Sequence, residues 1–223
     1  MSFTSNAFFV FLAIVFCLYW FVFRKNLKLQ NLFVVAASYL FYGWWDWRFL
    51  LLIALTSFCS WGSGLLIGRF RDNPCKARRI SAANIILNLG ILALFKYYDF
   101  FAQSFADLFL GGRADKLLLH LILPVGISFY TFQALSYSID VYRGKIEPVK
   151  DVVRFFAYVS FFPQLVAGPI ERATNLLPQF GRKREFDYTL AVDGLRQMLW
   201  GFFKKIVIAN FCAVYVDDVF AHP

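Results

Sequence analysis

The chain has 223 residues, a net charge of +9 and a pI of about 9.5. Hydrophobic residues make up 60 % of it and charged residues 17 %, with a mean hydropathy of +0.58. These values exclude a disordered chain, which has few aromatics and a high charge. They also exclude most soluble enzymes, because a soluble domain needs more polar surface. The composition predicts an integral membrane protein, since lipid solvates apolar side chains.

The basic residues lie in short breaks between apolar runs, which is typical of membrane topology rather than of a nucleic-acid-binding face. We therefore expect no nucleic-acid partner. The four cysteines form no C-x-x-C pair. His120 and His222 have no nearby carboxylate, Ser or Cys partner in the sequence. No metal site is predicted from these spacings.

Seven apolar runs follow one another along the chain. They are Ala7–Phe23, Leu29–Tyr42, Phe49–Gly68, Ile80–Phe95, Leu117–Ile139, Phe155–Ile170 and Leu190–Val216. A spanning helix needs about 20 apolar residues, with about 17 as the minimum. The first, third and fifth runs satisfy this, and the second and fourth do so when interfacial aromatics are counted. The pattern predicts an all-α, multi-pass transmembrane helical bundle, with residues 1–223 as a single membrane-embedded domain of five to seven hydrophobic segments.

The distribution of Lys and Arg predicts how the helices are oriented. The first five breaks between runs hold three, one, five, three and four of these residues. The breaks rich in basic residues belong in the cytoplasm. The N-terminus is therefore predicted outside, and the first, third and fifth breaks inside. Trp44, Trp45 and Trp47 then fall at the outer face, at the headgroup level that aromatic side chains prefer.

The sixth run differs from the others because both of its flanks are basic. Arg143–Arg154 precedes it, and Arg172–Arg184 follows it. A run that starts and ends in the cytoplasm is not a simple span, and its prolines and glycine would break a helix. We interpret it as a re-entrant or in-plane element, whose broken backbone must be satisfied by protein or by a water-filled cavity. The alternative is a kinked interfacial helix.

Polar residues of the fifth run recur at steps of three and four, which places them on one helical face. They are Gln133, Ser136 or Tyr137, Asp140 and Arg143. Either they line a polar cavity, or they only bridge packed helices, with Asp140 and Arg143 as a plain ion pair at the helix end. The other cavity-lining candidates are in or just after the sixth run: Pro163, Gln164, Gly168, Pro169, Glu171 and Arg172.

Lys204 and Lys205 interrupt the seventh run. We interpret them as an interfacial break between an in-plane helix and a new span, with snorkelling side chains. A role in attracting an anionic acyl donor on the cytoplasmic side is the alternative.

Three segments resemble the membrane-bound O-acyltransferase family. They are LPVGISFYTFQALSYSIDVYRG, YVSFFPQLVAGPIERATNLLPQF and GLRQMLWGFFKKIVIAN, in this order. The branch they resemble most is the bacterial, alginate O-acetylation type, which acetylates exported polysaccharide. The resemblance implies a multi-helix enzyme with a tunnel through the bilayer and an essential histidine that acts as general base.

The resemblance also implies the surroundings of the protein. The acyl donor is expected to be acetyl-coenzyme A or another acyl carrier that approaches from the cytoplasm, with no bound cofactor. The expected location is the bacterial cytoplasmic (inner) membrane. The expected partners are the lipid bilayer, a periplasmic or extracellular acetyl-transfer protein and the exported polysaccharide.

The family's essential histidine lies in the second half of its members, and neither His120 nor His222 matches it. We therefore expect this chain to be the N-terminal half of such a fold, with the catalytic histidine beyond its C-terminus, and to be inactive alone. The alternative is a truncated membrane binding or assembly subunit of an exopolysaccharide-modification complex. A channel or transporter module is a third possibility, which the three motifs disfavour.

Overall fold

A computed structural model describes residues 3–109, 118–119, 121–166 and 168–221. His120 and His222, and the Leu117 boundary of the fifth run, lie outside the described residues. Every regular element within those ranges is a helix, which confirms the all-α prediction. The chain divides into two compact units, one of residues 26–182 and one of residues 1–25 with 183–223.

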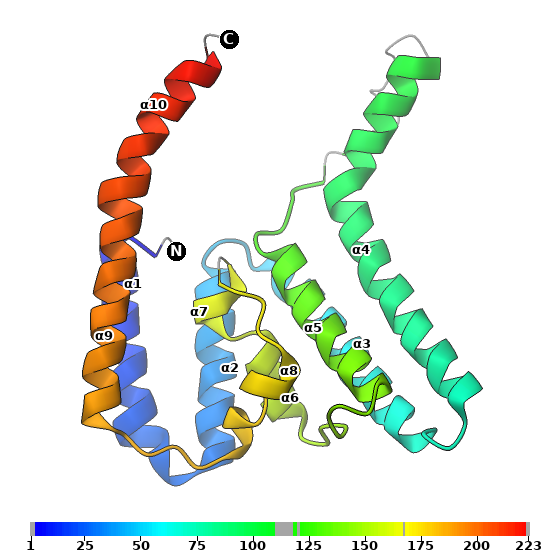
Figure 1. Cartoon of the computed structure of the whole chain (residues 1–223), viewed down its shortest axis with the longest axis horizontal. Helices are drawn as coiled ribbons and strands as arrows, with labels where there is room; N and C mark the ends of the chain where they lie inside the picture. Colours follow the sequence, from blue (N-terminus) through cyan, green and yellow to red (C-terminus); the bar gives the residue numbers. More distant parts are fainter. Residues whose placement is uncertain (1–2, 110–117, 120, 167, 222–223) are drawn as a thin grey trace. The chain divides into compact units, whose positions relative to one another are not determined.

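Four helices of 16 residues or more form the framework of the larger unit (Figure 1). They are α2 (Leu27–Gly43), α3 (Arg48–Arg69), α4 (Pro74–Phe109) and α5 (Ile127–Tyr142). α3 packs against both α4 and α5, and α4 also packs against α5. Ile53, Tyr130 and Tyr137 are almost completely buried where these helices meet. The core of the larger unit is therefore centred on α5.

Local side-chain hydrogen bonds fix where several helices begin. The Asn26 side chain accepts the backbone N–H groups of Lys28 and Leu29 and caps α2. Asn73 accepts the N–H of Lys76 in the first turn of α4. Such caps satisfy N–H groups that have no partner within the helix, and each contributes about 0.5–2 kcal/mol.

The sixth apolar run is broken, as the sequence predicted. It contributes to α6 (Val152–Val159) and α7 (Phe162–Leu165), and it is followed by α8 (Ala173–Leu176) and the 3₁₀ turn η3 (Gln179–Gly181). We call residues 152–181 the broken segment. Its ends meet, because the Arg154 side chain donates to the Leu177 carbonyl oxygen. The middle of the broken segment lies at the N-terminal end of α5, where the Leu165 carbonyl packs against Gly126. This course favours the re-entrant interpretation over a single kinked helix.

Two of the expected helix boundaries are wrong. The fifth run was expected to be helical from Leu117, but its described residues before α5 are non-helical and the helix begins only at Ile127. Pro124 disfavours helical geometry in the residue before it, and Gly126 adopts the left-handed conformation with φ +74°. The fourth run was expected to end at Phe95, but α4 continues to Phe109 because no glycine or proline interrupts it there.

The smaller unit consists of two helical segments. The first joins α1 (Asn6–Cys17) to the π-helical η1 (Leu18–Val22) and the 3₁₀ turn η2 (Phe23–Lys25). The second joins α9 (Tyr188–Phe203), the π-helical η4 (Lys204–Ala209) and α10 (Asn210–Ala221). The rings of Phe9 and Phe202 lie 5.2 Å apart and link the two segments.

The expected break in the helix at Lys204 and Lys205 is wrong, because the helix continues through both residues as a π-helical stretch. Their expected position at the membrane interface stays a prediction. Lysine is a good helix former, and no proline or glycine lies between Lys204 and Asn210. Backbone hydrogen bonding is therefore maintained where the hydropathy pattern alone indicated an interruption.

Four helical segments of the described residues are long and apolar enough to cross a membrane. They are Asn6–Lys25, Arg48–Arg69, Pro74–Leu108 and Tyr188–Ala221. α2 and α5, with 17 and 16 residues, are shorter. The chain is therefore a multi-pass membrane protein with shorter helices packed beside long ones.

Contacts in the larger unit test one part of the predicted topology. The Arg71 guanidinium of the third break lies 2.8 Å from the Glu147 carboxylate of the fifth break, which brings these two breaks to one end of the unit. At the other end, the Tyr42 hydroxyl donates to the Val125 carbonyl oxygen over 2.8 Å. The third and fifth breaks therefore share a side, as the counts of Lys and Arg predicted.

Candidate functional site

A buried polar cluster joins α5 to the broken segment. We call Gln133, Ser136, Tyr158 and the Glu171 carbonyl the Tyr158 node. The Gln133 amide donates to the Tyr158 carbonyl oxygen over 2.7 Å. The Tyr158 hydroxyl lies 3.1–3.2 Å from the Gln133 and Glu171 carbonyl oxygens and from Ser136 Oγ. Because a phenol has one proton, it donates to one of these oxygens at a time.

Tyr137, the residue after Ser136 in α5, points away from the Tyr158 node. Tyr137 is completely buried, and its hydroxyl accepts the Val149 N–H over 3.0 Å. Its ring lies 4.6 Å from the Phe155 ring, centroid to centroid, and directly against Gly64 of α3. Tyr137 therefore joins α3 to the loop after α5, and its contacts are those of a packing residue.

A second polar cluster lies between α3, α4 and α5. The Asn84 amide donates to Ser138 Oγ over 2.9 Å, and Ser60 Oγ donates to Asn84 Oδ1 over 3.3 Å. The Asn88 amide donates to the same Asn84 oxygen over 3.0 Å. Sequence reasoning missed this cluster. The available signal was a pair of asparagines four residues apart in an apolar run, because polar groups at membrane depth need partners.

The last two residues of the predicted polar stripe do not extend the Tyr158 node. Asp140 is 8 % exposed and lies near the end of α5, whereas Arg143 follows the helix and is exposed. The ion pair between them, given above as an alternative, is absent from the salt bridges of the described residues. The side chains of the predicted polar stripe therefore face different surroundings and do not line one common cavity.

The predicted residues of the broken segment have different environments. The Gln164 side-chain oxygen is buried and has no hydrogen-bond partner within the described part of the chain. The Gly168 N–H donates to the Gln164 carbonyl oxygen over 3.0 Å, and a Cβ on Gly168 would lie only 2.5 Å from Gln164 Cα. Pro163, Pro169 and Arg172 are exposed. Only Glu171, through its carbonyl, belongs to the Tyr158 node.

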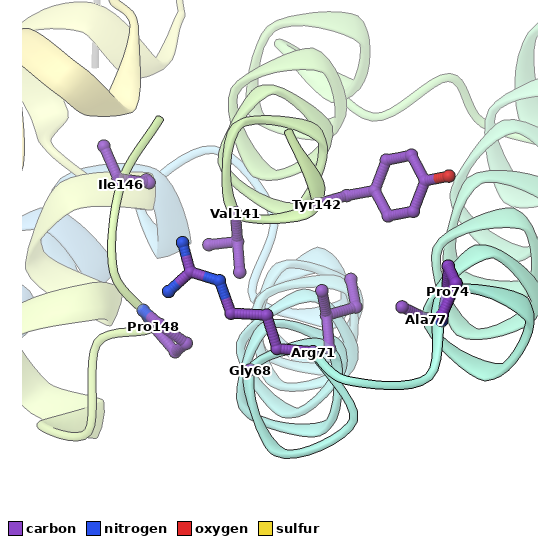
Figure 2. Close-up of a pocket in the computed structure, with 9 residues that line it drawn as sticks. Gly68, Arg71, Pro74, Ala77, Val141, Tyr142, Ile146 and Pro148 are labelled. Carbon is purple, nitrogen blue, oxygen red and sulfur yellow. The ribbon is translucent and has the colours of Figure 1, made fainter. Parts of the chain in front are cut away.

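A pocket of about 270 Å³ opens where α3, α4 and α5 meet the loops that join them (Figure 2). Its residues are Ile67, Gly68, Arg71, Pro74, Ala77, Val141, Tyr142, Ile146 and Pro148. The Arg71 guanidinium donates to the Glu147 carboxylate over 2.8 Å at the rim. This hydrogen bond raises the pKa of Arg71 above its usual value. We call this site the Arg71 pocket.

Lys204 and Lys205, the donor-side candidates, belong to the smaller unit and are exposed. The Lys204 ammonium lies 5.8 Å from the centre of the Trp200 ring, which is a cation–π arrangement. The groups of the Tyr158 node are neutral amides, hydroxyls and carbonyls. Such a node can orient a backbone segment or a bound polar group through hydrogen bonds.

The chain was compared with known proteins. It is 37 % identical to a protein of Pseudomonas aeruginosa named "Probable alginate O-acetylase AlgI" over 99 % of this chain and 42 % of that protein. An Azotobacter vinelandii protein of the same name is 36 % identical over 99 % of this chain and 44 % of the relative. A peptidoglycan O-acetyltransferase of Helicobacter pylori is 32 % identical over 87 % of this chain and 41 % of the relative.

The chain thus spans less than half the length of these relatives. No family profile and no solved structure matches it.

Proposed function

We propose that this chain, which resembles the membrane-bound O-acyltransferase family, is part of a bacterial O-acetyltransferase that acetylates an exported polysaccharide. The observation that carries the proposal is the 37 % identity to alginate O-acetylases along 99 % of the chain. Identity over the whole chain includes the packed core as well as the motifs. It therefore supports a shared fold and a shared role.

Alginate is the polymer that we propose first. Five relatives named for alginate O-acetylation are 34–37 % identical to the chain. Peptidoglycan is the second candidate, because the Helicobacter pylori relative is 32 % identical. Both polymers present sugar hydroxyls as acceptors, so the chemistry of the transfer is the same.

For the reaction, we propose acetyl-coenzyme A or another acyl carrier as the cytoplasmic donor, in the bacterial inner membrane. A periplasmic or extracellular transfer protein is the proposed acceptor of the acetyl group. We propose that the general base is a histidine in the part of the enzyme that corresponds to the uncovered length of the relatives, since a placed base contributes about 10²–10⁴-fold to such a step. The Tyr158 node would hold the broken segment against α5 during transfer.

The test is a chimera in a Pseudomonas aeruginosa strain that lacks its alginate O-acetylase. This chain replaces the aligned segment of the relative, and the acetyl content of secreted alginate is measured by NMR. We expect the chimera to restore acetylation and this chain alone to restore none. The matched control carries the relative's own segment between the same junctions.

A chimera that reaches the membrane at the control's level but leaves the alginate unacetylated would contradict the proposal. Acetylation by this chain alone, surviving mutation of His120 and His222, would contradict the proposed source of the base. Stable capture of other membrane proteins together with an inactive chimera would favour the binding or assembly subunit instead.

A further inference from the structure

The Arg71 pocket lies where two candidate membrane spans end. The span Arg48–Arg69 finishes just before it, and the span Pro74–Leu108 begins beside it. The ends of spans lie at the level of the lipid headgroups, where basic side chains meet anionic lipid. The pocket therefore lies at the boundary between the membrane-spanning helices and the loops that connect them.

Basic residues from two separate breaks converge on this end of the unit. They are Arg69, Arg71, Lys76, Arg78 and Arg79 from the third break, and Arg143, Lys145, Lys150 and Arg154 from the fifth. The Arg71–Glu147 salt bridge brings the two breaks together. Their acidic residues are fewer: Asp72, Asp140, Glu147 and Asp151. The excess of positive charge favours an anion at this end.

The pocket has the chemistry of an amphiphile site. Arg71 is its only charged lining residue, and Ile67, Val141, Ile146 and Pro148 supply apolar wall. Figure 2 shows the Arg71 guanidinium extended across the opening between Val141 and Pro148. A ligand with a phosphate at one end and aliphatic chains beside it matches this lining, because guanidinium binds phosphate in a bidentate manner.

A phosphate can replace Glu147 as the partner of Arg71. The Arg71 and Glu147 side chains are 60 % and 77 % exposed, and exposed ion pairs contribute little to stability. The N-terminus of α4 adds a second attraction, since the positive end of the helix dipole begins at Pro74 in the pocket wall. A phosphate that displaces Glu147 would therefore gain two favourable interactions.

We propose that the Arg71 pocket binds the phosphate of an anionic membrane phospholipid, with its glycerol and first methylenes on the apolar wall. The proposal is independent of the acetyl-transfer reaction.

The test uses native mass spectrometry of the full chain purified in detergent. Phosphatidylglycerol is titrated against phosphatidylcholine with the same acyl chains. We expect phosphatidylglycerol to bind more tightly, and Arg71→Gln to weaken it by about fivefold or more, the scale of one basic contact with an anionic lipid. Arg48→Gln, which removes the same charge at the opposite end of α3, is the matched control and should change little.

A second variant guards against misfolding of the first. Glu147→Gln frees Arg71 from its carboxylate, so it should strengthen phosphatidylglycerol binding. Equal binding of the two lipids by the unmodified chain would overturn the proposal, as would equal losses in Arg71→Gln and Arg48→Gln. Displacement of the lipid by coenzyme A would also overturn it, because the phosphate would then come from a soluble donor.

Discussion

The Arg154 guanidinium donates two hydrogen bonds, of 3.1 and 2.9 Å, to the carbonyl oxygen of Leu177. These residues lie near the two ends of the broken segment. The contact therefore closes that segment into a loop that leaves one end of the larger unit and returns to it. Hydrogen bonds from a charged donor are the stronger kind and are worth about 1.5–3 kcal/mol.

Replacing Arg154 should loosen this closure. Arg154→Ala removes both hydrogen bonds, and we expect it to destabilise the larger unit by about 1–3 kcal/mol. Thermal unfolding of the purified chain in detergent measures the effect. The control is Arg182→Ala, since Arg182 is exposed just beyond the same segment. Equal unfolding temperatures for the two variants would show that the contact does not hold the segment.

Gly126 should tolerate no larger residue. It has φ +74°, and a Cβ there would collide with the Leu165 carbonyl oxygen. Left-handed geometry alone costs a side chain about 1–2 kcal/mol. Gly126→Ala should therefore lower the yield of folded protein and its unfolding temperature. Gly90→Ala, at an open position of α4, should be neutral or stabilising because alanine favours helix.

The close approach of α3 and α5 can be tested with two glycines of one helix. A Cβ on Gly64 would lie 2.5 Å from the Tyr137 ring, whereas a Cβ on Gly62 would meet nothing within 4 Å. We expect Gly64→Ala to cost about 1–3 kcal/mol through overpacking. Gly62→Ala should not be destabilising. Chemical denaturation of both variants in the same detergent makes the comparison, and similar losses would contradict the packing.

The Tyr158 hydroxyl should hold the part of the broken segment around Glu171. Tyr158→Phe keeps the ring but removes the hydroxyl that lies 3.1 Å from the Glu171 carbonyl. The expected loss is about 1 kcal/mol, with faster amide hydrogen exchange at residues 168–172. Tyr142→Phe is the control, because the Tyr142 side chain is 42 % exposed. Unchanged exchange in Tyr158→Phe would show that the hydroxyl does not order this segment.

The sequence predicted best what depends on hydropathy and charge. The counts of Lys and Arg placed the third and fifth breaks at one end, and Arg71 and Glu147 form a salt bridge there. Basic flanks and prolines predicted the broken segment, because helix breakers act locally. The direction of each polar side chain depends on which helices are neighbours. The sequence therefore predicted that Gln133 points into the protein, but it did not identify the Tyr158 carbonyl of α6 as its hydrogen-bond acceptor.

Other errors came from the assumption that a helix begins and ends where an apolar run does. The run before Ile127 is hydrophobic enough for a helix, but the conformation of Gly126 delays its start. At Lys204, two charges indicated a break that the backbone does not make. Hydropathy reports the solvent that a segment prefers, whereas backbone dihedral angles decide where a helix begins and ends.

The uninterrupted helix from Tyr188 to Ala221 has a consequence for how deeply it can be immersed. Its 34 residues correspond to about 50 Å at 1.5 Å per residue, which exceeds a hydrocarbon thickness of about 30 Å. Lys204 and Lys205 lie at its midpoint, where a cation at the bilayer centre costs about 2.5–3.5 kcal/mol. Hydrophobic mismatch and charge therefore act together, and the helix is most stable when shifted along its axis, with the two lysines near one surface and one half projecting beyond the lipid.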